Sequence, residues 1–273
     1  MDMLAFTVEI RKRRFTFPEL LYAAYALFIR YFRVLFLITI IVSIPVNVLR
    51  VVLKPVNDRA AAYTLSVSEQ QLFPRMKPGM DAASYDTFVK QYRELLPVAV
   101  DVVGFFLGFI EILASMAVIF MANEVVNGGR ASVRSGFAKA LSRWPYAAGA
   151  HLLSTLAVAG GLLLFIIPGV ILYVRYIFCI EAAVLRNTGF AGALQYSTDL
   201  VRGKWIEVFA FVILLLIGAN MINLLIMTPF IELRENIPVR VLSGTLFSIF
   251  FNYFSLCSVL FFLNLDFTRS KEA

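Results

Sequence analysis

Four ionisable side chains lie inside long apolar runs of the sequence, and they are the residues best placed to do chemistry. They are Asp101, Glu111, Arg175 and Glu181. A charge at the centre of a bilayer costs at least about 2.5–3.5 kcal/mol, so such a residue faces the interior of a helix bundle and usually has a partner there. We predict that Arg175 pairs with Glu111, with Glu181 as the second candidate. Arg175 and Glu181 meet less easily, because their spacing places them roughly 120° out of register on one helix.

These buried charges allow two interpretations. In the first, Glu111, Arg175 and Glu181 line a polar pathway for protons, ions or a lipid headgroup. In the second, which is the commoner case, one buried ion pair holds two helix hairpins together. The sequence is compatible with both, because each requires charged side chains inside the bundle.

Patterns typical of catalysis or metal binding are missing from the sequence. The single histidine, His151, lies near one end of an apolar run, where a structural role is commoner than a catalytic one. Cys179 and Cys257 lie inside apolar runs and are interpreted as small buried hydrophobic residues. No phosphate-binding loop, nucleophile elbow or zinc-protease motif occurs. We therefore expect no enzyme activity, no cofactor and no metal.

The elements that must position these residues are membrane-spanning helices. Hydrophobic residues make up 60% of the chain and charged residues only 16%, against roughly 25% charged residues in ordinary globular domains. A span needs roughly 20 apolar residues, and the long run around Gly160-Gly161 and Pro168-Gly169 is interpreted as a tight hairpin of two spans. The predicted fold is an all-α polytopic membrane protein with six transmembrane helices in three hairpins. The expected spans are residues 34–53, 98–122, 145–164, 168–187, 206–228 and 241–265.

A short amphipathic segment precedes the first helix of each predicted hairpin. These segments cover residues 17–33, 136–144 and 189–205, and each ends in arginine beside an aromatic ring. Such helices lie in the membrane interface. The predicted interface anchors are Arg30, Arg143, Trp144, Arg202, Lys204 and Trp205. The alternative interpretation is that arginine and tryptophan simply mark the edge of any membrane loop.

Basic residues predict the orientation of the chain. The net charge is +7, and the excess falls on the side of the N-terminus, so we expect both termini in the cytoplasm. Residues 1–33 are predicted to be a cytoplasmic basic segment with an interfacial helix, and residues 34–273 a six-helix membrane domain with an outer loop at 54–97. Anionic membrane lipids are the expected partners, with other membrane proteins or a second copy of the chain as further candidates. Nucleic acid is not expected, because the soluble segments are too short to build a binding module.

Amide side chains inside the spans are expected to hold helices together. Asn220 and Asn223 fall in the fifth span, and Asn252 and Asn264 fall in the sixth. Amides within a membrane form hydrogen bonds across helices, each worth about 0.6 kcal/mol.

One stretch of the chain resembles a known family. It runs from Ile166-Ile167-Pro168-Gly169 through Arg175 and Glu181 to Ser197, and it ends in Arg202-Gly203-Lys204-Trp205. This pattern resembles bacterial six-span inner-membrane proteins of the YciC-like group and the membrane domain fused to some glycerophosphodiester phosphodiesterases. The match covers residues 140–210. The resemblance implies a bacterial plasma membrane and a noncatalytic membrane module, and the long outer loop departs from it.

Two functions follow as hypotheses. The first is a noncatalytic accessory or scaffold subunit of a membrane complex. The second is a small transporter or lipid-handling protein in which Glu111, Arg175 and Glu181 line a cavity. A cavity at these side chains favours the second, whereas a dry ion pair favours the first.

Overall fold

The computed structural model describes the backbone of residues 9–66, 82–233 and 236–272, and it describes side chains for residues 9–50, 103–104, 106–230, 233 and 236–269. Within these ranges every regular element is helical. The elements, in chain order, are α2 (Phe17–Arg30), α3 (Phe32–Ser66), α5 (Ala82–Val126), α6 (Val133–Leu164), α7 (Ile166–Tyr176), α8 (Cys179–Leu185), α9 (Phe190–Val201), α10 (Trp205–Met227), the 3₁₀ turn η2 (Thr228–Leu233) and α11 (Ile237–Glu272).

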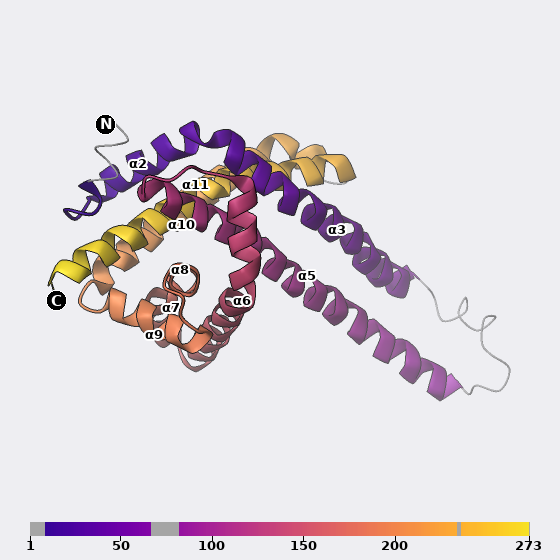
Figure 1. Ribbon diagram of the computed structural model, residues 1–273. Helices are drawn as coiled ribbons and strands as arrows, with labels where there is room; N and C mark the ends of the chain where they lie inside the picture. The colour runs from indigo at the N-terminus through magenta and orange to yellow at the C-terminus, as the bar shows by residue number, and fades with distance from the viewer. Residues whose placement is uncertain (1–8, 67–81, 234–235, 273) are drawn as a thin grey trace.

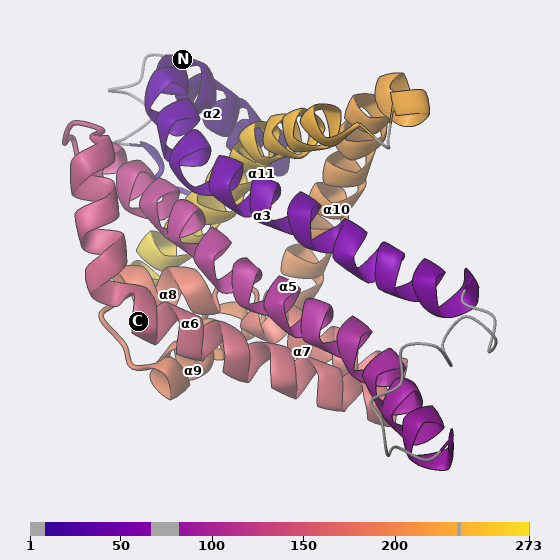
Figure 2. The same cartoon turned by 90° about the vertical axis from the view of Figure 1, so that its right-hand side faces the viewer.

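Within the described ranges, six segments are long and apolar enough to cross a membrane, so the prediction of an all-α, multi-pass membrane protein is confirmed. They are Phe32–Arg50, Phe106–Val126, Val133–Leu164, Ile166–Leu185, Trp205–Phe230 and Ile237–Arg269. In chain order they pack as three hairpins: α3 against α5, α6 against α7, and α10 against α11. Helix α11 also packs along α2, α3 and α5, so the last span joins the first hairpin (Figures 1 and 2).

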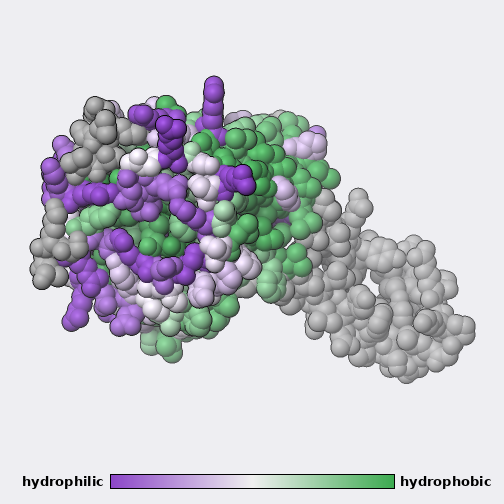
Figure 3. All heavy atoms as spheres, viewed as in Figure 1, coloured by the Kyte–Doolittle hydropathy of each residue, from purple (hydrophilic) through white to green (hydrophobic). Residues whose placement is uncertain are grey.

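The polar and apolar surfaces are segregated. Figure 3 shows hydrophilic residues gathered at one end of the molecule and a broad apolar surface beside them. The start of α2 and the end of α11 lie at this same polar end, as an even number of spans requires (Figure 1). The turn between α6 and α7 carries some of the most exposed apolar side chains, Leu163, Phe165 and Ile166, which suits contact with lipid.

The tight hairpin predicted inside the long apolar run is present. Helix α6 ends at Leu164, Phe165 is extended, and α7 begins at Ile166. Gly161 of α6 lies directly against Gly169 of α7, so close that a Cβ atom built on Gly161 would lie 3.0 Å from the Gly169 Cα. The two glycines therefore permit the close approach of the two helices.

The three predicted surface helices differ from one another in the structure. Helices α2 and α9 are separate, as expected, but residues 136–144 are not a separate helix, because they belong to α6. Figure 2 shows α6 as two limbs joined by a sharp bend. We attribute the bend to Pro145 inside the helix, because proline removes a backbone hydrogen bond and clashes with the preceding turn. Residues 136–144 therefore run in a different direction from the rest of α6, although the helix is continuous through Pro145.

The predicted outer loop at 54–97 is partly helical. Helix α3 continues to Ser66, and α5 begins at Ala82. Residues 67–81 lie outside the described part of the chain.

Polar side chains tie the ends of the bundle together. The Asn264 amide of α11 donates to the carbonyl oxygens of Ile10 and Arg13, both at 2.8 Å, and accepts from the Phe15 N–H at 2.9 Å. Asp266 lies two residues after Asn264 on α11 and accepts hydrogen bonds from Arg186 and Tyr196. The end of α11 therefore binds the segment before α2, the end of α8, and α9.

Candidate functional site

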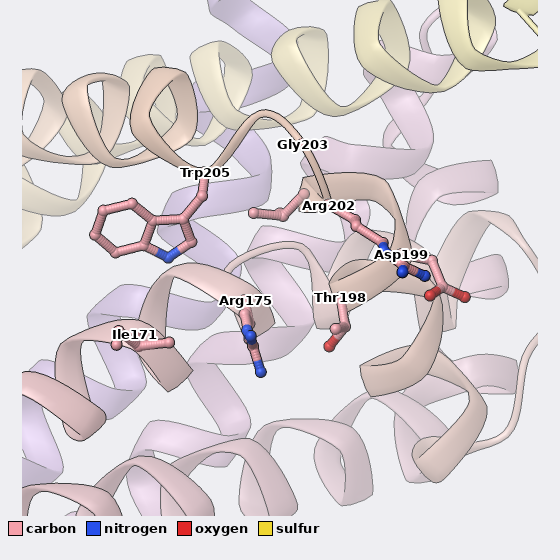
Figure 4. A pocket seen from close by; sticks show the side chains of 8 residues that line it. Ile171, Arg175, Thr198, Asp199, Arg202, Gly203 and Trp205 are labelled. Atoms are coloured by element: carbon pink, nitrogen blue, oxygen red, sulfur yellow. The ribbon is translucent and has the colours of Figure 1, made fainter.

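A pocket of about 660 Å³ opens between α7, α9 and the turn into α10. We call it the arginine pocket, after Arg175 and Arg202. Figure 4 shows Trp205 on one side, Asp199 and Arg202 on the other, and Arg175 and Thr198 between them. Its lining residues are Ile171, Arg175, Thr198, Asp199, Val201, Arg202, Gly203 and Trp205.

A break in the fourth span positions Arg175. Helix α7 ends at Tyr176 and α8 begins at Cys179, so backbone groups between them lose their helical partners. Ser197 of α9 is fully buried and bridges the break: its hydroxyl donates to the Arg175 carbonyl oxygen at 2.7 Å and accepts from the Phe178 N–H at 3.2 Å. Arg175 thus lies in the last turn of α7, beside α9.

The opposite wall of the pocket is built by the turn between α9 and α10. Gly203 has a φ of +78°, a left-handed conformation that glycine adopts without strain. The turn places Arg202 before it and Trp205 after it, and the Trp205 ring stacks on Phe209 with the centroids 5.1 Å apart. The Trp205 indole nitrogen is buried, and no acceptor among the described residues bonds to it.

The charges of the arginine pocket do not cancel. Two guanidinium groups, of Arg175 and Arg202, face one carboxylate, of Asp199. Within the described ranges, no side-chain hydrogen bond or ion pair engages the Arg175 guanidinium. An arginine in a segment that spans a membrane needs compensation. The pocket therefore presents a net positive charge and unused hydrogen-bond donors.

Both predicted partners of Arg175 are bound elsewhere, so the predicted ion pair is wrong. Glu111 accepts a hydrogen bond from Arg50 of α3 at 3.1 Å. Glu181 accepts one from the Ser258 hydroxyl of α11 at 2.6 Å. Arg50 was not predicted as the partner of Glu111, because it lies near the end of the first apolar run. Asp101 belongs to α5, but its side chain lies outside the described ranges.

Glu181 lies at a second cavity, of about 240 Å³, between the helices and partly open at the exposed residues Tyr173, Leu216 and Phe251. We call it the Glu181 cavity. It is bounded by α5, α7, α8, α10 and α11, and its walls are apolar apart from a few hydroxyl groups and this one carboxylate. The lining residues are Ser115, Ile119, Tyr173, Ile177, Phe178, Ile180, Glu181, Phe211, Val212, Leu215, Leu216, Ala219, Phe251, Phe254, Ser255 and Ser258.

A third cavity, of about 270 Å³, follows polar faces of α3, α5 and α11. It shares Ser115 and Phe251 with the Glu181 cavity. Two hydrogen bonds cross between α3 and α11 here: Asn252 donates to Thr39, and Asn47 donates to Thr245 at 3.4 Å. The polar lining residues are Thr39, Ser43, Asn47, Arg50, Glu111, Ser115, Ser248 and Asn252.

This polar face was not predicted, although the spacing of polar residues in the first apolar run indicates it. Thr39, Ser43 and Asn47 follow one another at intervals of four residues, which places them on one side of α3. The expectation for Asn252 is confirmed, since its amide bonds across helices. Asn220 differs, because its amide donates to the Leu216 carbonyl oxygen of its own helix at 2.8 Å.

The predicted interface anchors take different positions. The Arg143 guanidinium donates to the carbonyl oxygens of Ala183 and Thr188, at 2.8 and 3.1 Å, and the Trp144 indole donates to the Phe109 carbonyl oxygen at 3.0 Å. These two residues therefore join α6 to α8 and α5. Arg202 and Trp205 line the arginine pocket. Arg30 is exposed at the end of α2, and Lys204 lies in the turn before α10.

Metal ligands do not converge in the described part of the chain: no group of three His, Cys, Asp or Glu side chains comes together there. No family model, curated protein or solved structure matches the chain. The resemblance to the YciC-like group therefore stays a prediction.

Proposed function

We propose that this chain is a noncatalytic lipid-handling membrane protein that binds an anionic phospholipid headgroup in the arginine pocket. The observation that carries the proposal is the charge of that pocket, where Arg175 and Arg202 face the single carboxylate of Asp199. A phosphodiester supplies one negative charge and several acceptor oxygens. Guanidinium groups bind phosphate through paired hydrogen bonds, and the unused indole N–H of Trp205 is a further donor.

The position of the pocket in the chain agrees with this function. It lies at the start of α10, next to basic residues that predict the cytoplasmic side of a bacterial plasma membrane, with both termini on that side. The cytoplasmic leaflet carries anionic lipids, which are attracted to arginine near the membrane surface. The acyl chains of such a lipid would lie along the exposed apolar surface of the adjoining helices.

A lipid-binding assay tests this function. Purified protein in mild detergent is incubated with phosphatidylglycerol or with zwitterionic phosphatidylcholine, and the retained lipid is measured by native mass spectrometry. We expect the double substitution Arg175→Gln and Arg202→Gln to reduce phosphatidylglycerol retention by about tenfold, the effect of roughly 1.4 kcal/mol of lost ion pairing. Arg30→Gln is the matched control, because Arg30 is an exposed arginine outside the pocket.

Two results would contradict the proposed function. One is equal retention of phosphatidylglycerol by the wild-type protein and the double variant. The other is equal loss of retention in the Arg30→Gln control, because that result would mean general attraction to a basic surface. Raising the salt concentration should weaken retention, because Arg175 and Arg202 are both exposed and exposed charges are screened by salt.

A scaffold or accessory-subunit role is the second candidate, and one observation on α10 favours it. Asn220 lies in the central part of the Trp205–Phe230 span, and its side chain is exposed. An amide facing lipid leaves hydrogen-bonding groups unsatisfied, whereas an amide of another helix would satisfy them. The test is the oligomeric state in detergent of Asn220→Leu against the control Met221→Leu. If the two variants and the wild-type protein have the same particle mass in detergent, the exposed Asn220 is not evidence for a partner helix.

A further inference from the structure

The Glu181 cavity holds a carboxylate that has no counter-charge among the described residues. Glu181 is only 5% exposed, and its single side-chain hydrogen bond among the described residues comes from Ser258. No arginine or lysine of the described part of the chain lines the cavity. Burying an ionised carboxylate without a cation is costly, so a positive ligand would gain both from the charge and from the space beside it.

Aromatic rings form much of the remaining wall. Phe178, Phe211 and Phe254 are all buried, and Tyr173 and Phe251 complete the set from α7 and α11. The face of an aromatic ring attracts a cation, by about 0.5–1 kcal/mol at exposed sites and about 2 or more when water is excluded. Aromatic rings around an acidic group are the arrangement that recognises ammonium ions with alkyl substituents.

The lining is poorly suited to a metal ion. Hard cations such as Ca²⁺ and Mg²⁺ take six or more oxygen ligands, and Zn²⁺ takes four ligands in a tetrahedral site that usually includes nitrogen or sulfur. The cavity offers the Glu181 carboxylate and the hydroxyls of Ser115, Ser255 and Ser258, spread over three helices among apolar side chains. A ligand with an apolar body fits these walls better than a bare ion.

We propose that the Glu181 cavity is a binding site for a small organic cation, an amine or quaternary ammonium with apolar substituents, held by the Glu181 carboxylate and the surrounding aromatic rings. This site is separate from the arginine pocket and takes a ligand of opposite charge. It adjoins the polar cavity of α3, α5 and α11 through Ser115 and Phe251. The two cavities therefore meet at these two residues.

Binding of benzyltrimethylammonium to the purified full-length protein tests the inference. Affinity is measured by isothermal titration calorimetry in detergent, with the neutral carbon isostere neopentylbenzene as a competitor. We expect saturable binding of the cation, and no comparable competition from the isostere. Glu181→Gln keeps the shape of the side chain and should weaken binding at least about tenfold, because the attraction to the charge is lost.

The control is Glu111→Gln, which removes a carboxylate that is paired with Arg50 and does not line the Glu181 cavity. It should leave cation affinity within about twofold, inside the ordinary scatter of distant substitutions. Phe254→Leu provides a second variant in case Glu181→Gln does not fold, and it should weaken binding by about three- to fivefold through loss of one ring face.

The inference is overturned by any of three results. The wild-type protein shows no saturable binding, the neutral isostere competes as well as the cation itself, or the folded Glu181 variant binds as tightly as the wild-type protein. A proton would then satisfy the carboxylate in place of an organic cation. None of these results bears on phosphatidylglycerol retention, so the lipid-handling function is judged separately.

Discussion

The Ser197 hydroxyl of α9 donates a hydrogen bond to the Arg175 carbonyl oxygen at the break between α7 and α8. The same hydroxyl accepts from the Phe178 N–H, on the other side of the break. Backbone groups at membrane depth must be satisfied within the protein, and one buried side chain satisfies two of them here. Helix α9 is thereby fixed against the broken span, and the arginine pocket lies between them.

The substitution Ser197→Ala should destabilise the protein. It leaves a partly buried carbonyl oxygen and a buried N–H unpaired, which costs about 1–3 kcal/mol for such groups. The measurement is thermal unfolding in detergent, followed by circular dichroism. Ser248→Ala is the control, because the Ser248 hydroxyl donates only to the Gly244 carbonyl oxygen of its own helix. Equal midpoints for the two variants would mean that the bridge is unimportant.

Two neighbouring glycines of α6 should respond oppositely to alanine. A Cβ atom on Gly161 would lie 3.0 Å from the Gly169 Cα, so Gly161→Ala should push the hairpin apart and cost about 1–3 kcal/mol. Gly160 has open space around it, so Gly160→Ala should be neutral or stabilising by about 0.5–1 kcal/mol, since alanine favours the helix. Thermal unfolding of both variants checks this. A stable Gly161 variant would contradict the close packing of α6 and α7.

The hydrogen bond from Asn252 to Thr39 should couple α11 to α3. A double-mutant cycle of Asn252→Leu and Thr39→Val is expected to give about 0.6 kcal/mol of coupling, with an upper bound of about 1.7 kcal/mol. Chemical unfolding in mixed micelles supplies the four free energies. A repeat of the cycle with Thr39→Val and Asn220→Leu should give no coupling, because Asn220 bonds within α10. A coupling energy in that second cycle would mean that the coupling energy of the first cycle does not measure the hydrogen bond between Asn252 and Thr39.

Low pH should destabilise the N-terminal turn of α2. The Arg13 guanidinium and the Thr16 N–H bond to the Glu19 carboxylate and lower its pKa from about 4.5 to about 2. A carboxyl group whose pKa is lower in the folded state than in the unfolded state stabilises the folded protein fully at pH values above the unfolded-state pKa. That contribution is lost as the pH falls from about 4.5 towards 2.

The measurement for Glu19 is the unfolding temperature between pH 5 and 2, in steps of about half a unit across the window of the shift. Glu19→Gln should flatten the dependence in this range and leave the protein slightly less stable at neutral pH. Glu9→Gln is the control, since Glu9 only pairs with Arg13 at the more distant 3.4 Å. The same acid dependence in the wild-type and Glu19→Gln proteins would contradict the assignment.

The membrane helices follow from the sequence because lipid imposes a local requirement. Each span needs a continuous apolar run of sufficient length, and Gly160-Gly161 with Pro168-Gly169 marks the turn within the longest run. The amphipathic segments before α3 and α10 were also predictable, because their apolar residues recur at helical spacing. The continuity of α6 through Pro145 was not predictable, because a helix that bends at proline and one that ends there have the same local pattern.

The contacts of the charged residues were decided by the tertiary structure alone. Which side chain reaches Arg175, Glu111 or Glu181 depends on how each helix is rotated and tilted against its neighbours. A run that is apolar on all sides, as in α10, gives no periodic signal of that rotation. The sequence therefore determined that these charges belong to membrane-spanning helices. The expectation that all of them are buried is wrong for Arg175, whose side chain is exposed, whereas Glu181 is buried. Packing determined that Glu111 meets Arg50, that Glu181 meets Ser258, and that Arg175 faces a pocket with Arg202.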